Sequence, residues 1–383
     1  MKKSSSLYLK FIIVCCIFFL LAGCSNINSE SKNGKMTADT VQQKENIDSK
    51  AEKIVASMSL SEKIGQMMMI GVRGKEINDD SRYLLNEYHM GGIIFFDRNM
   101  QAQEQVRKFT EDLQKNSNEK VPLFIAMDEE GGRVVRMKNA LIPPPSQQEI
   151  GQSGDIDNAQ KWAQKTAKSL KEMGINVNFA PVADVGSNDT RSYSKEAKTV
   201  TEFVAAAAKG YEQENIIYAL KHFPGIGKGK VDSHKELSAI TASEKTLQAE
   251  DFLPFQTVVK NNNPDNYMIL VSHLKYTALD EKNPASLSTY IITELLRKKM
   301  GYKGIVITDD MEMGAVSKHY NFSELGVKAV QAGADIVMVC HEYPHEEDVY
   351  MGLLDAAKKG EISQSRIDES VKRIVKVKLQ HLK

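Results

Sequence analysis

The segment GIVITDD, residues 304–310, is an apolar, β-branched run that ends in two carboxylates. Short apolar runs of the same kind recur along the chain, separated by longer stretches with helical spacing: QMMMIGV (66–72), GGIIFFD (91–97), PLFIAMD (122–128), INVNFAPVAD (175–184), IIYALKHF (216–223), YMILVSHL (267–274) and ADIVMVC (334–340). Apolar strands that alternate with helices are typical of a parallel sheet covered on both faces. Eight such strands predict a closed (β/α)8 barrel of the TIM type, for which about 330 residues is a fitting length. The alternative is an open doubly wound sheet, but no Gly-x-Gly-x-x-Gly follows the first run.

The composition is that of a globular protein with balanced charge. Of 383 residues, 42% are hydrophobic and 26% are charged, with 50 basic and 50 acidic side chains. This supplies enough apolar material for a large core. The charge balance gives no reason to expect nucleic acid as a partner. A monomer is the expected state.

The N-terminus has the features of a targeting segment. Three lysines accompany an apolar run of 13 residues, FIIVCCIFFLLAG (11–23), which is short for a membrane span but suits a signal-peptide core. The sequence Leu21-Ala22-Gly23-Cys24 resembles a bacterial lipobox, which implies cleavage before Cys24 and lipid attachment to its thiol. A plain secretory signal and an uncleaved anchor are the alternatives. The prediction is an extracytoplasmic protein held at the cell membrane by its lipid.

Three segments follow from this interpretation. Residues 1–23 are the signal peptide, and residues 24–49 are the lipidated cysteine with a disordered tether, because that stretch is polar and lacks aromatic residues. Residues 50–383 form the single barrel domain. Cys340 is the one cysteine beyond the lipobox, and its apolar surroundings predict a buried structural thiol.

Ionisable residues follow six of the eight apolar runs. They are Asp97-Arg98, Asp128-Glu129-Glu130, Asp184, Lys221-His222, His273 and Asp309-Asp310. In a (β/α)8 barrel the carboxyl ends of all strands share one mouth, and active sites form there. We therefore expect a site for a polar ligand at this mouth rather than a set of solvated turns.

The loop KHFPGIGKGKVDSH (221–234) has the densest polar chemistry of these strand ends. It lacks the spacing of a Walker A phosphate loop. Asp232 and His234 are two residues apart, so in extended backbone they face the same side, and the carboxylate can orient the imidazole. An aspartate orients a histidine in this way in hydrolytic triads.

Asp309 is the second candidate for chemistry. A carboxylate at a strand end can attack an electrophilic carbon, bind a metal or pair with a lysine. Cations in the same set of loops disfavour a metal: Arg133, Arg136, Arg191 and Lys221. Neither a metal nor an organic cofactor is expected.

Five ordered motifs resemble the bacterial β-N-acetylglucosaminidases of glycoside hydrolase family 3. The motifs are KHFPG…DSH (221–234), ITDDMEMGAV (307–316), MDEEGGRVVRM (127–137), NFAPVADV…RSY (178–193) and SHLKYTALD…PASLS (272–288), and the resemblance runs over about residues 50–383. By position it implies that Asp309 is the nucleophile and that His234, held by Asp232, is the general acid/base. The resemblance also implies a set of sugar-binding residues: Asp128, Arg136, Arg191, Lys221 and His222.

The implied activity is exo-acting, retaining removal of terminal β-linked N-acetylglucosamine from peptidoglycan-derived fragments or muropeptides. Retaining hydrolysis needs a carboxylate nucleophile below the anomeric carbon and a proton donor beside the leaving oxygen. Histidine suits the second role, since its ordinary pKa of about 6.5 allows proton transfer in both directions near neutral pH.

Three alternatives stay open. Asp309 and Asp310 could polarise an attacking acetamido group, as in substrate-assisted hexosaminidases. Phosphate could replace water in the second step, which would make the protein a phosphorylase. The barrel could also be a lipid-anchored module that binds an amino sugar without turnover.

The sequence departs from the family pattern in the loop that carries His234. Where the family usually has His-Gly-Asp-Thr, this chain has Ile226, Lys228 and Gly229 in place of the histidine, aspartate and threonine. Lys228 and Lys230 could then face an acidic stem peptide on a wall fragment. Some family members have a second domain after the barrel, but ISQSRIDESVKRIVKVKLQ (362–380) has the pattern of a last barrel helix, so none is expected here.

Overall fold

The computed structural model describes residues 38–117, 121–138, 141–186, 189–229 and 238–382, with side chains from residue 46 onward. Two compact units are distinguished, residues 1–45 and 46–383, and the second contains all of the described strands. No helix of these described segments is both long enough and apolar enough to cross a membrane.

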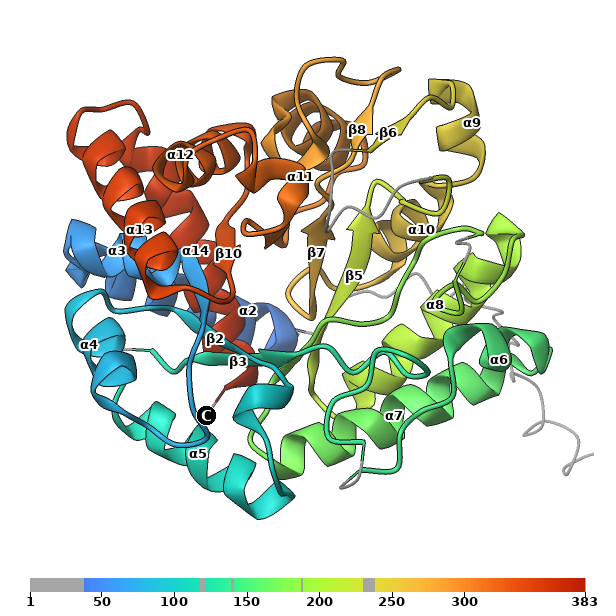
Figure 1. Ribbon diagram of the computed structural model, residues 1–383, viewed down its shortest axis with the longest axis horizontal. Coiled ribbons are helices and arrows are strands. Elements are labelled where there is room, and N and C mark those ends of the chain that lie inside the picture. Colours follow the sequence, from blue (N-terminus) through green and yellow to red (C-terminus); the bar gives the residue numbers. More distant parts are fainter. Residues whose placement is uncertain (1–37, 118–120, 139–140, 187–188, 230–237, 383) are drawn as a thin grey trace, which may run out of the picture. The chain divides into compact units, whose positions relative to one another are not determined.

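Eight strands of the second unit form a closed barrel in which every neighbouring pair is parallel (Figure 1). Their bounds are β1 (Met68–Gly71), β2 (Gly92–Phe95), β3 (Phe124–Met127), β4 (Val177–Asn178), β5 (Ile217–Phe223), β7 (Tyr267–Val271), β9 (Ile305–Asp310) and β10 (Ile336–Val339). Each strand pairs with the next barrel strand in the chain, and β10 closes onto β1. The predicted (β/α)8 barrel is confirmed, and the open sheet is excluded.

Helices precede, separate and follow these strands along the chain, and those that lie wholly in the second unit surround the barrel (Figure 1). They are α2 (Ala38–Ser57), α3 (Leu60–Gln66), α4 (Asp79–Glu87), α5 (Gln103–Lys115), α6 (Gln147–Gln152), α7 (Ile156–Glu172), α8 (Ala197–Gln213), α9 (Glu244–Ala249), α10 (Leu253–Asn261), α11 (Gly314–Ser317), α12 (Phe322–Ala332), α13 (Tyr343–Lys358) and α14 (Gln364–His381), with the 3-10 turns η1 (Asp97–Asn99) and η2 (Ala285–Leu287) and the π-helix η3 (Tyr290–Lys299). A capping box begins α3, with the Ser59 side chain accepting from the amide of Glu62.

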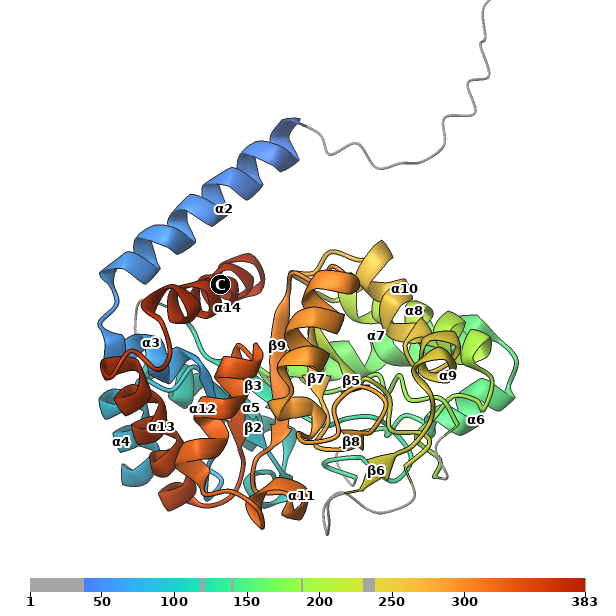
Figure 2. The same ribbon diagram turned by 90° about the horizontal axis from the view of Figure 1, so that it is seen from above.

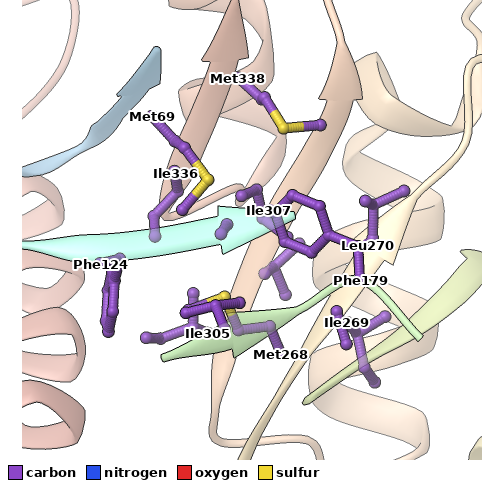
Figure 3. Packing of buried hydrophobic residues seen from close by; sticks show 14 of the residues in the cluster. Met69, Phe124, Phe179, Met268, Ile269, Leu270, Ile305, Ile307, Ile336 and Met338 are labelled. Carbon is purple, nitrogen blue, oxygen red and sulfur yellow. The ribbon is translucent and has the colours of Figure 1, made fainter. Parts of the chain in front are cut away.

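The barrel strands are buried on both faces, which explains why they are continuous apolar runs. Every residue of β1, β2, β3 and β10 is buried, and their side chains pack with those of β7 and β9 (Figure 3). β9 differs at its end, where Asp309 and Asp310 become partly exposed. The polar chemistry of this strand therefore begins where its apolar core ends.

The outer helices pack closely where small residues permit it. The buried face of α7 contains Ala159, Ala163 and Ala167. α7 lies against α8, where a Cβ on Gly210 would come within 2.4 Å of the Gln160 carbonyl oxygen. Gly174 follows α7 at φ +76°, a left-handed conformation that favours glycine.

The helix α2 corrects one expectation about the N-terminal region. It begins at Ala38, inside the stretch 24–49 that was assigned to a tether. The low apolar content of this stretch argued for disorder, but alanine, glutamine, lysine and glutamate are good helix formers, and no glycine or proline interrupts Ala38–Ser57. The signal peptide and Cys24 lie outside the described residues.

A two-stranded parallel sheet lies beyond the carboxyl ends of β5 and β7 (Figure 2). Its strands are β6 (Ala239–Ile240) and β8 (Lys275–Tyr276). Tyr276 donates a hydrogen bond to the Gly225 carbonyl oxygen at 2.9 Å, which ties this sheet to the loop after β5. Neither strand has a long apolar run of its own, because β8 follows directly after the run that contains β7, so this sheet was not predicted.

Candidate active site

The barrel brings the predicted strand-end residues to one mouth. Asp128, Lys221, His222 and Asp309 lie at or directly after the carboxyl ends of β3, β5 and β9. Because all eight strands are parallel, these ends open on the same side.

Lys221 lies at the centre of an ion-pair cluster. Its Nζ is 2.6 Å from Asp128 Oδ1 and 2.6 Å from Glu130 Oε1, and its side chain is only 3% exposed. Burial disfavours the charged forms of all three groups, but their mutual attraction outweighs it. The pKa of Lys221 is therefore raised, and the pKa values of Asp128 and Glu130 are lowered.

Glu130 also holds the second cation of the site. Arg191 donates from Nε and from Nη2 to the two carboxylate oxygens of Glu130, both at 2.7 Å. This bidentate geometry fixes the plane of the guanidinium group. Burial opposes the charge of Arg191, but Glu130 more than offsets it and raises the pKa of the guanidinium.

His222 is oriented from both ring nitrogens. Its Nδ1 is 2.8 Å from Asp184 Oδ2, and its Nε2 is 3.2 Å from Arg191 Nη2. An arginine can only donate, so Nε2 accepts and the ring proton is on Nδ1, where it is donated to Asp184. The pKa of Asp184 is lowered, because His222 and two backbone amides stabilise its charge against the effect of burial.

Arg136 completes the cluster from the loop after β3. Its guanidinium lies 3.3 Å from Asp128 and 3.4 Å from Asp97, and 5.3 Å from the centre of the Phe96 ring. Its backbone amide donates to Glu129 at 2.8 Å. Burial raises the pKa of Glu129 to about 8, so near neutral pH this carboxyl is largely protonated.

The carboxylate of Asp309 is oriented by the backbone at the end of β9. Its Oδ1 accepts a hydrogen bond from the Asp310 amide at 3.0 Å. The Asp310 carbonyl oxygen in turn accepts from His273 Nε2 at 2.8 Å, and His273 Nδ1 is 2.7 Å from Ser286 Oγ. Burial lowers the pKa of His273, which suits a neutral ring that fixes the backbone here.

In its described part, the loop after β5 packs closely against neighbouring segments. A Cβ on Gly227 would meet the Val185 carbonyl oxygen at 1.8 Å, so only glycine fits there. Lys228 pairs with Asp251 at 2.5 Å and with Glu250 at 2.9 Å. This corrects the expectation that Lys228 faces an acidic peptide, because its charge is used within the protein. Asp232, His234 and Lys230 lie outside the described residues.

Three side chains near Asp309 are of types that bind metal ions, but one of them has no acceptor position free for a cation. One ligand atom each from Asp310, Glu312 and His341 lies within 4.8 Å of the others. The Glu312 oxygens, however, accept from the amides of residues 340, 341 and 342 and lie 2.6 Å from His345 Nδ1. A carboxylate has about four acceptor sites, so Glu312 has no free one left for a cation.

The assembled site matches a neutral, hydroxyl-rich ligand. Arginine and lysine heads supply directional donors, Asp128 supplies an acceptor, and the ion pairs hold each group in place. Asp309 adds a carboxylate at the same mouth. All five predicted sugar-binding residues and Asp309 are brought to this mouth, where the five join one network.

Sequence reasoning missed two residues that organise this site. Glu130 binds both Lys221 and Arg191, and Asp184 orients His222. Both stood among the ionisable strand ends, which was the available signal. Neither was given a role, because their partners lie 38 to 91 residues away in the chain.

Comparisons with known proteins agree with this geometry. A family model described as the N-terminal domain of glycosyl hydrolase family 3 matches residues 59–377. Beta-hexosaminidase A of Pseudoalteromonas piscicida is 33% identical over 84% of this chain and 61% of its own length. Beta-hexosaminidase LpqI of Mycobacterium tuberculosis is 32% identical over 85% of this chain and 84% of its own.

Solved structures give the same result. A glycoside hydrolase family 3 β-N-acetylglucosaminidase from Paenibacillus sp. str. FPU-7 superimposes with a TM-score of 0.82 at 36% identity, over 85% of this chain and 63% of that one. The structure of M. tuberculosis LpqI gives a TM-score of 0.78 at 30% identity, over 86% of this chain and 96% of that one. The chain thus spans less than two thirds of some relatives and nearly all of others.

Proposed function

This chain belongs to glycoside hydrolase family 3, and on that premise we propose that it is an exo-acting, retaining β-N-acetylglucosaminidase. The observation that carries the proposal is the ion-pair network of Asp128, Lys221, Glu130 and Arg191 at the same barrel mouth as Asp309. The relatives named as hexosaminidases support the choice of sugar.

The network suits a single terminal sugar. Charge-assisted donors from Lys221 and Arg191 and the acceptor Asp128 can bind vicinal hydroxyl groups, and their mutual ion pairs keep them oriented before the sugar arrives. A binding set that closes around one pyranose favours attack at a chain end. This is the basis for exo action.

The reaction follows in two steps. Asp309 attacks the anomeric carbon while His234 donates a proton to the leaving oxygen, which gives a glycosyl-enzyme on Asp309. His234 then removes a proton from water, which attacks the same carbon and releases the sugar with its original configuration. Asp232 fixes the tautomer of His234 and stabilises its cationic form.

The proposed substrates are peptidoglycan-derived fragments that end in β-linked N-acetylglucosamine. This follows from the proposed location, because a signal peptide at residues 1–23 and a lipid on Cys24 would hold a monomeric barrel at the outer surface of the cell membrane, beside the wall. No metal or organic cofactor has a role in this mechanism.

Hydrolysis of an aryl N-acetyl-β-D-glucosaminide tests the proposal. We expect turnover by the wild-type protein, with the β anomer as the first product seen by NMR. Asp309→Asn should lower kcat by roughly a thousandfold or more, because asparagine lacks the anionic oxygen that attacks the anomeric carbon. The exposed Asp348→Asn on α13 is the matched control and should leave kcat unchanged.

The same assay separates the competing reactions. Adding phosphate should leave N-acetylglucosamine as the product, whereas a phosphorylase would release the sugar 1-phosphate. Binding of N-acetylglucosamine without any turnover would contradict the enzyme and favour a binding module. The α anomer as the first product would contradict retention.

A further inference from the structure

We propose that His341 is a positioning residue for the nucleophile Asp309 and that it acts through Asp310. The inference rests on the proposed function for the role of Asp309. A chain of contacts supports it, which runs from His341 after β10 through Asp310 to the Asp309 carboxylate at the end of β9.

Asp310 is the link next to the nucleophile. Its amide donates to Asp309 Oδ1 at 3.0 Å, so the direction of this N–H decides how the Asp309 carboxylate is turned. The side chain of Asp310 is tied on both oxygens: Oδ1 accepts from the Glu312 amide at 3.1 Å, and Oδ2 lies 3.3 Å from His341 Nε2. Fixing this side chain fixes the peptide unit that orients Asp309.

His341 is itself held in one orientation. Arg98 Nη1 lies 3.0 Å from His341 Nδ1 and can only donate, so Nδ1 accepts and the ring proton is on Nε2, the nitrogen that lies 3.3 Å from Asp310 Oδ2. Arg98 is anchored by donating to the carbonyl oxygens of Cys340 at 2.5 Å and Val72 at 3.2 Å. The ends of β1, η1 and β10 therefore set the tautomer of His341.

Glu312 fixes the backbone that carries His341. It accepts from the His341 amide at 2.5 Å and from the amides on either side, and it lies 2.6 Å from His345 Nδ1. The close approach of Asp310, Glu312 and His341 thus has a structural explanation without a bound metal. The hydrogen bond to Asp310 also raises the pKa of His341, consistent with a favourable contact between them.

We call the contacts of His341 with Asp310 and of Asp310 with Asp309 the His341 clamp. Two adjacent carboxylates explain why it is needed. Asp309 has to face the anomeric carbon, while Asp310 carries the same charge one residue away. If His341 were lost, Asp310 Oδ2 would lose this partner, and the side chain could turn about its remaining contact with the Glu312 amide. The Asp310 N–H that is directed at Asp309 Oδ1 could then shift with it. A displacement of about 1 Å of a reacting group can lower a rate by roughly a hundredfold.

The test compares two substitutions of His341 with a control histidine. Glutamine keeps an uncharged N–H that can reach Asp310, whereas leucine fills the space without a donor. His319→Leu changes an exposed histidine in the segment after α11. The measurements are kcat and KM on an aryl N-acetyl-β-D-glucosaminide and the affinity for free N-acetylglucosamine.

For His341→Leu we expect kcat to fall by about tenfold or more, with the affinity for the free sugar within about threefold of wild type. His341→Gln should recover most of this loss, and His319→Leu should match wild type. If His341→Leu does not fold, His341→Asn replaces it, because its shorter amide cannot reach Asp310. A kcat for His341→Leu or His341→Asn within about threefold of wild type would overturn the proposal, as would a glutamine variant as slow as leucine.

A wild-type protein without hydrolytic activity would contradict the proposed function but not decide the clamp. Crystal structures of wild type, His341→Leu and His341→Gln decide it independently of activity. The clamp predicts that the Asp309 carboxylate turns in the leucine variant and keeps its orientation in the glutamine variant. An Asp309 carboxylate that is unchanged in the leucine variant would refute the clamp.

Discussion

Glu130 shows how much of this site depends on one residue that need not touch the ligand. It is 2% exposed and binds Lys221 at 2.6 Å and Arg191 at 2.7 Å. Removing one partner of a buried ionic network leaves the others uncompensated, which typically costs about 3–5 kcal/mol. Lys221 keeps Asp128 as a partner, so part of this cost is avoided.

The first prediction concerns this residue. Glu130→Gln should weaken binding of N-acetylglucosamine by roughly tenfold or more, because Lys221 and Arg191 lose the anion that orients them. Titration calorimetry with the free sugar measures this. Glu104→Gln, an exposed carboxylate on α5 that pairs with Arg107, is the control. A sugar affinity equal to that of wild type would show that Lys221 and Arg191 do not depend on Glu130.

At this scale the sequence predicted which residues gather but not how they pair. Lys221 and His222 are adjacent in the chain, yet Lys221 binds carboxylates after β3, and His222 binds Asp184 after β4. Strand-end position indicates that a residue reaches the mouth. The choice of partner depends on side-chain reach across the barrel, which a linear pattern does not contain.

Among the elements, the loop after β5 departs from the family pattern at Ile226, Lys228 and Gly229. Lys228 stands where the resemblance has an aspartate, and it bridges Glu250 and the fully buried Asp251 between α9 and α10. Burial raises the pKa of Asp251 to about 6 even with Lys228 beside it. The pair therefore anchors the start of the loop whenever Asp251 is ionised, above about pH 6.

The second prediction follows from this pair. Lys228→Ala should lower the free energy of unfolding by about 1–2 kcal/mol at pH 8, since Lys228 is partly exposed but its partner is buried. Lys228→Arg should retain most of the stability, and the exposed Lys245→Ala on α9 should have little effect.

The loss of stability in Lys228→Ala should depend on pH. Without Lys228, the unpaired Asp251 is best tolerated when protonated, so the loss in Lys228→Ala should shrink as the pH falls below about 6. Urea unfolding at pH 5 and pH 8 measures both values. A loss that is equal at the two pH values would mean that the Asp251 pair does not anchor the loop.

Secondary structure was predicted where the pattern was long. All eight barrel strands fall inside the predicted apolar runs. The start of α2 was missed because the polar composition of the stretch was given more weight than its helix propensity. β6 and β8 were missed because neither has a long apolar run of its own. Neither of these two strands has enough residues to show an alternation.

At the amino end of β10, on the side of the barrel opposite the mouth, a second ionic network is centred on Asp335. This residue precedes β10 and is fully buried. It lies 2.5 Å from Arg297, 3.0 Å from Arg373 and 3.4 Å from Arg366, and accepts from Ser370 and from the Val306 amide. Burial opposes its charge, but the arginines outweigh burial and lower its pKa. This network ties β9 and β10 to η3 and α14.

The third prediction separates stability from activity. Asp335→Ala should reduce the free energy of unfolding by about 3–5 kcal/mol at pH 7, because three arginines lose their shared anion. The kcat of the folded variant should stay near wild type, since Asp335 lies at the amino end of β10 and the site at the carboxyl ends.

The sign with pH follows from the lowered pKa. The Asp335 contribution is present above the ordinary pKa of aspartate, near 3.9, and is lost as the pH falls through its lower folded-state value. The gap between wild type and Asp335→Ala should therefore narrow in acid, as measured by unfolding between pH 7 and pH 3. The exposed Glu281→Ala is the control. A gap that widens in acid would contradict this account.

The fold as a whole was predictable because its main determinant is local and repeated. A buried parallel strand needs an apolar run, and eight of them separated by helices leave few alternatives to a barrel. The mouth was predictable for the same reason. The Lys228 pair and the His341 clamp depend on contacts between segments that are distant in the chain, and no repeated sequence pattern indicates such contacts.

The proposed mechanism requires that Asp309 forms the covalent intermediate. The direct measurement is mass spectrometry after reaction with a 5-fluorinated N-acetylglucosaminyl fluoride, which forms a glycosyl-enzyme faster than it is hydrolysed. The account predicts one added glycosyl group, located on Asp309 in the peptide that follows Lys303, and no adduct in Asp309→Asn. Turnover without any adduct, or an adduct on Asp310 or another residue, would contradict it.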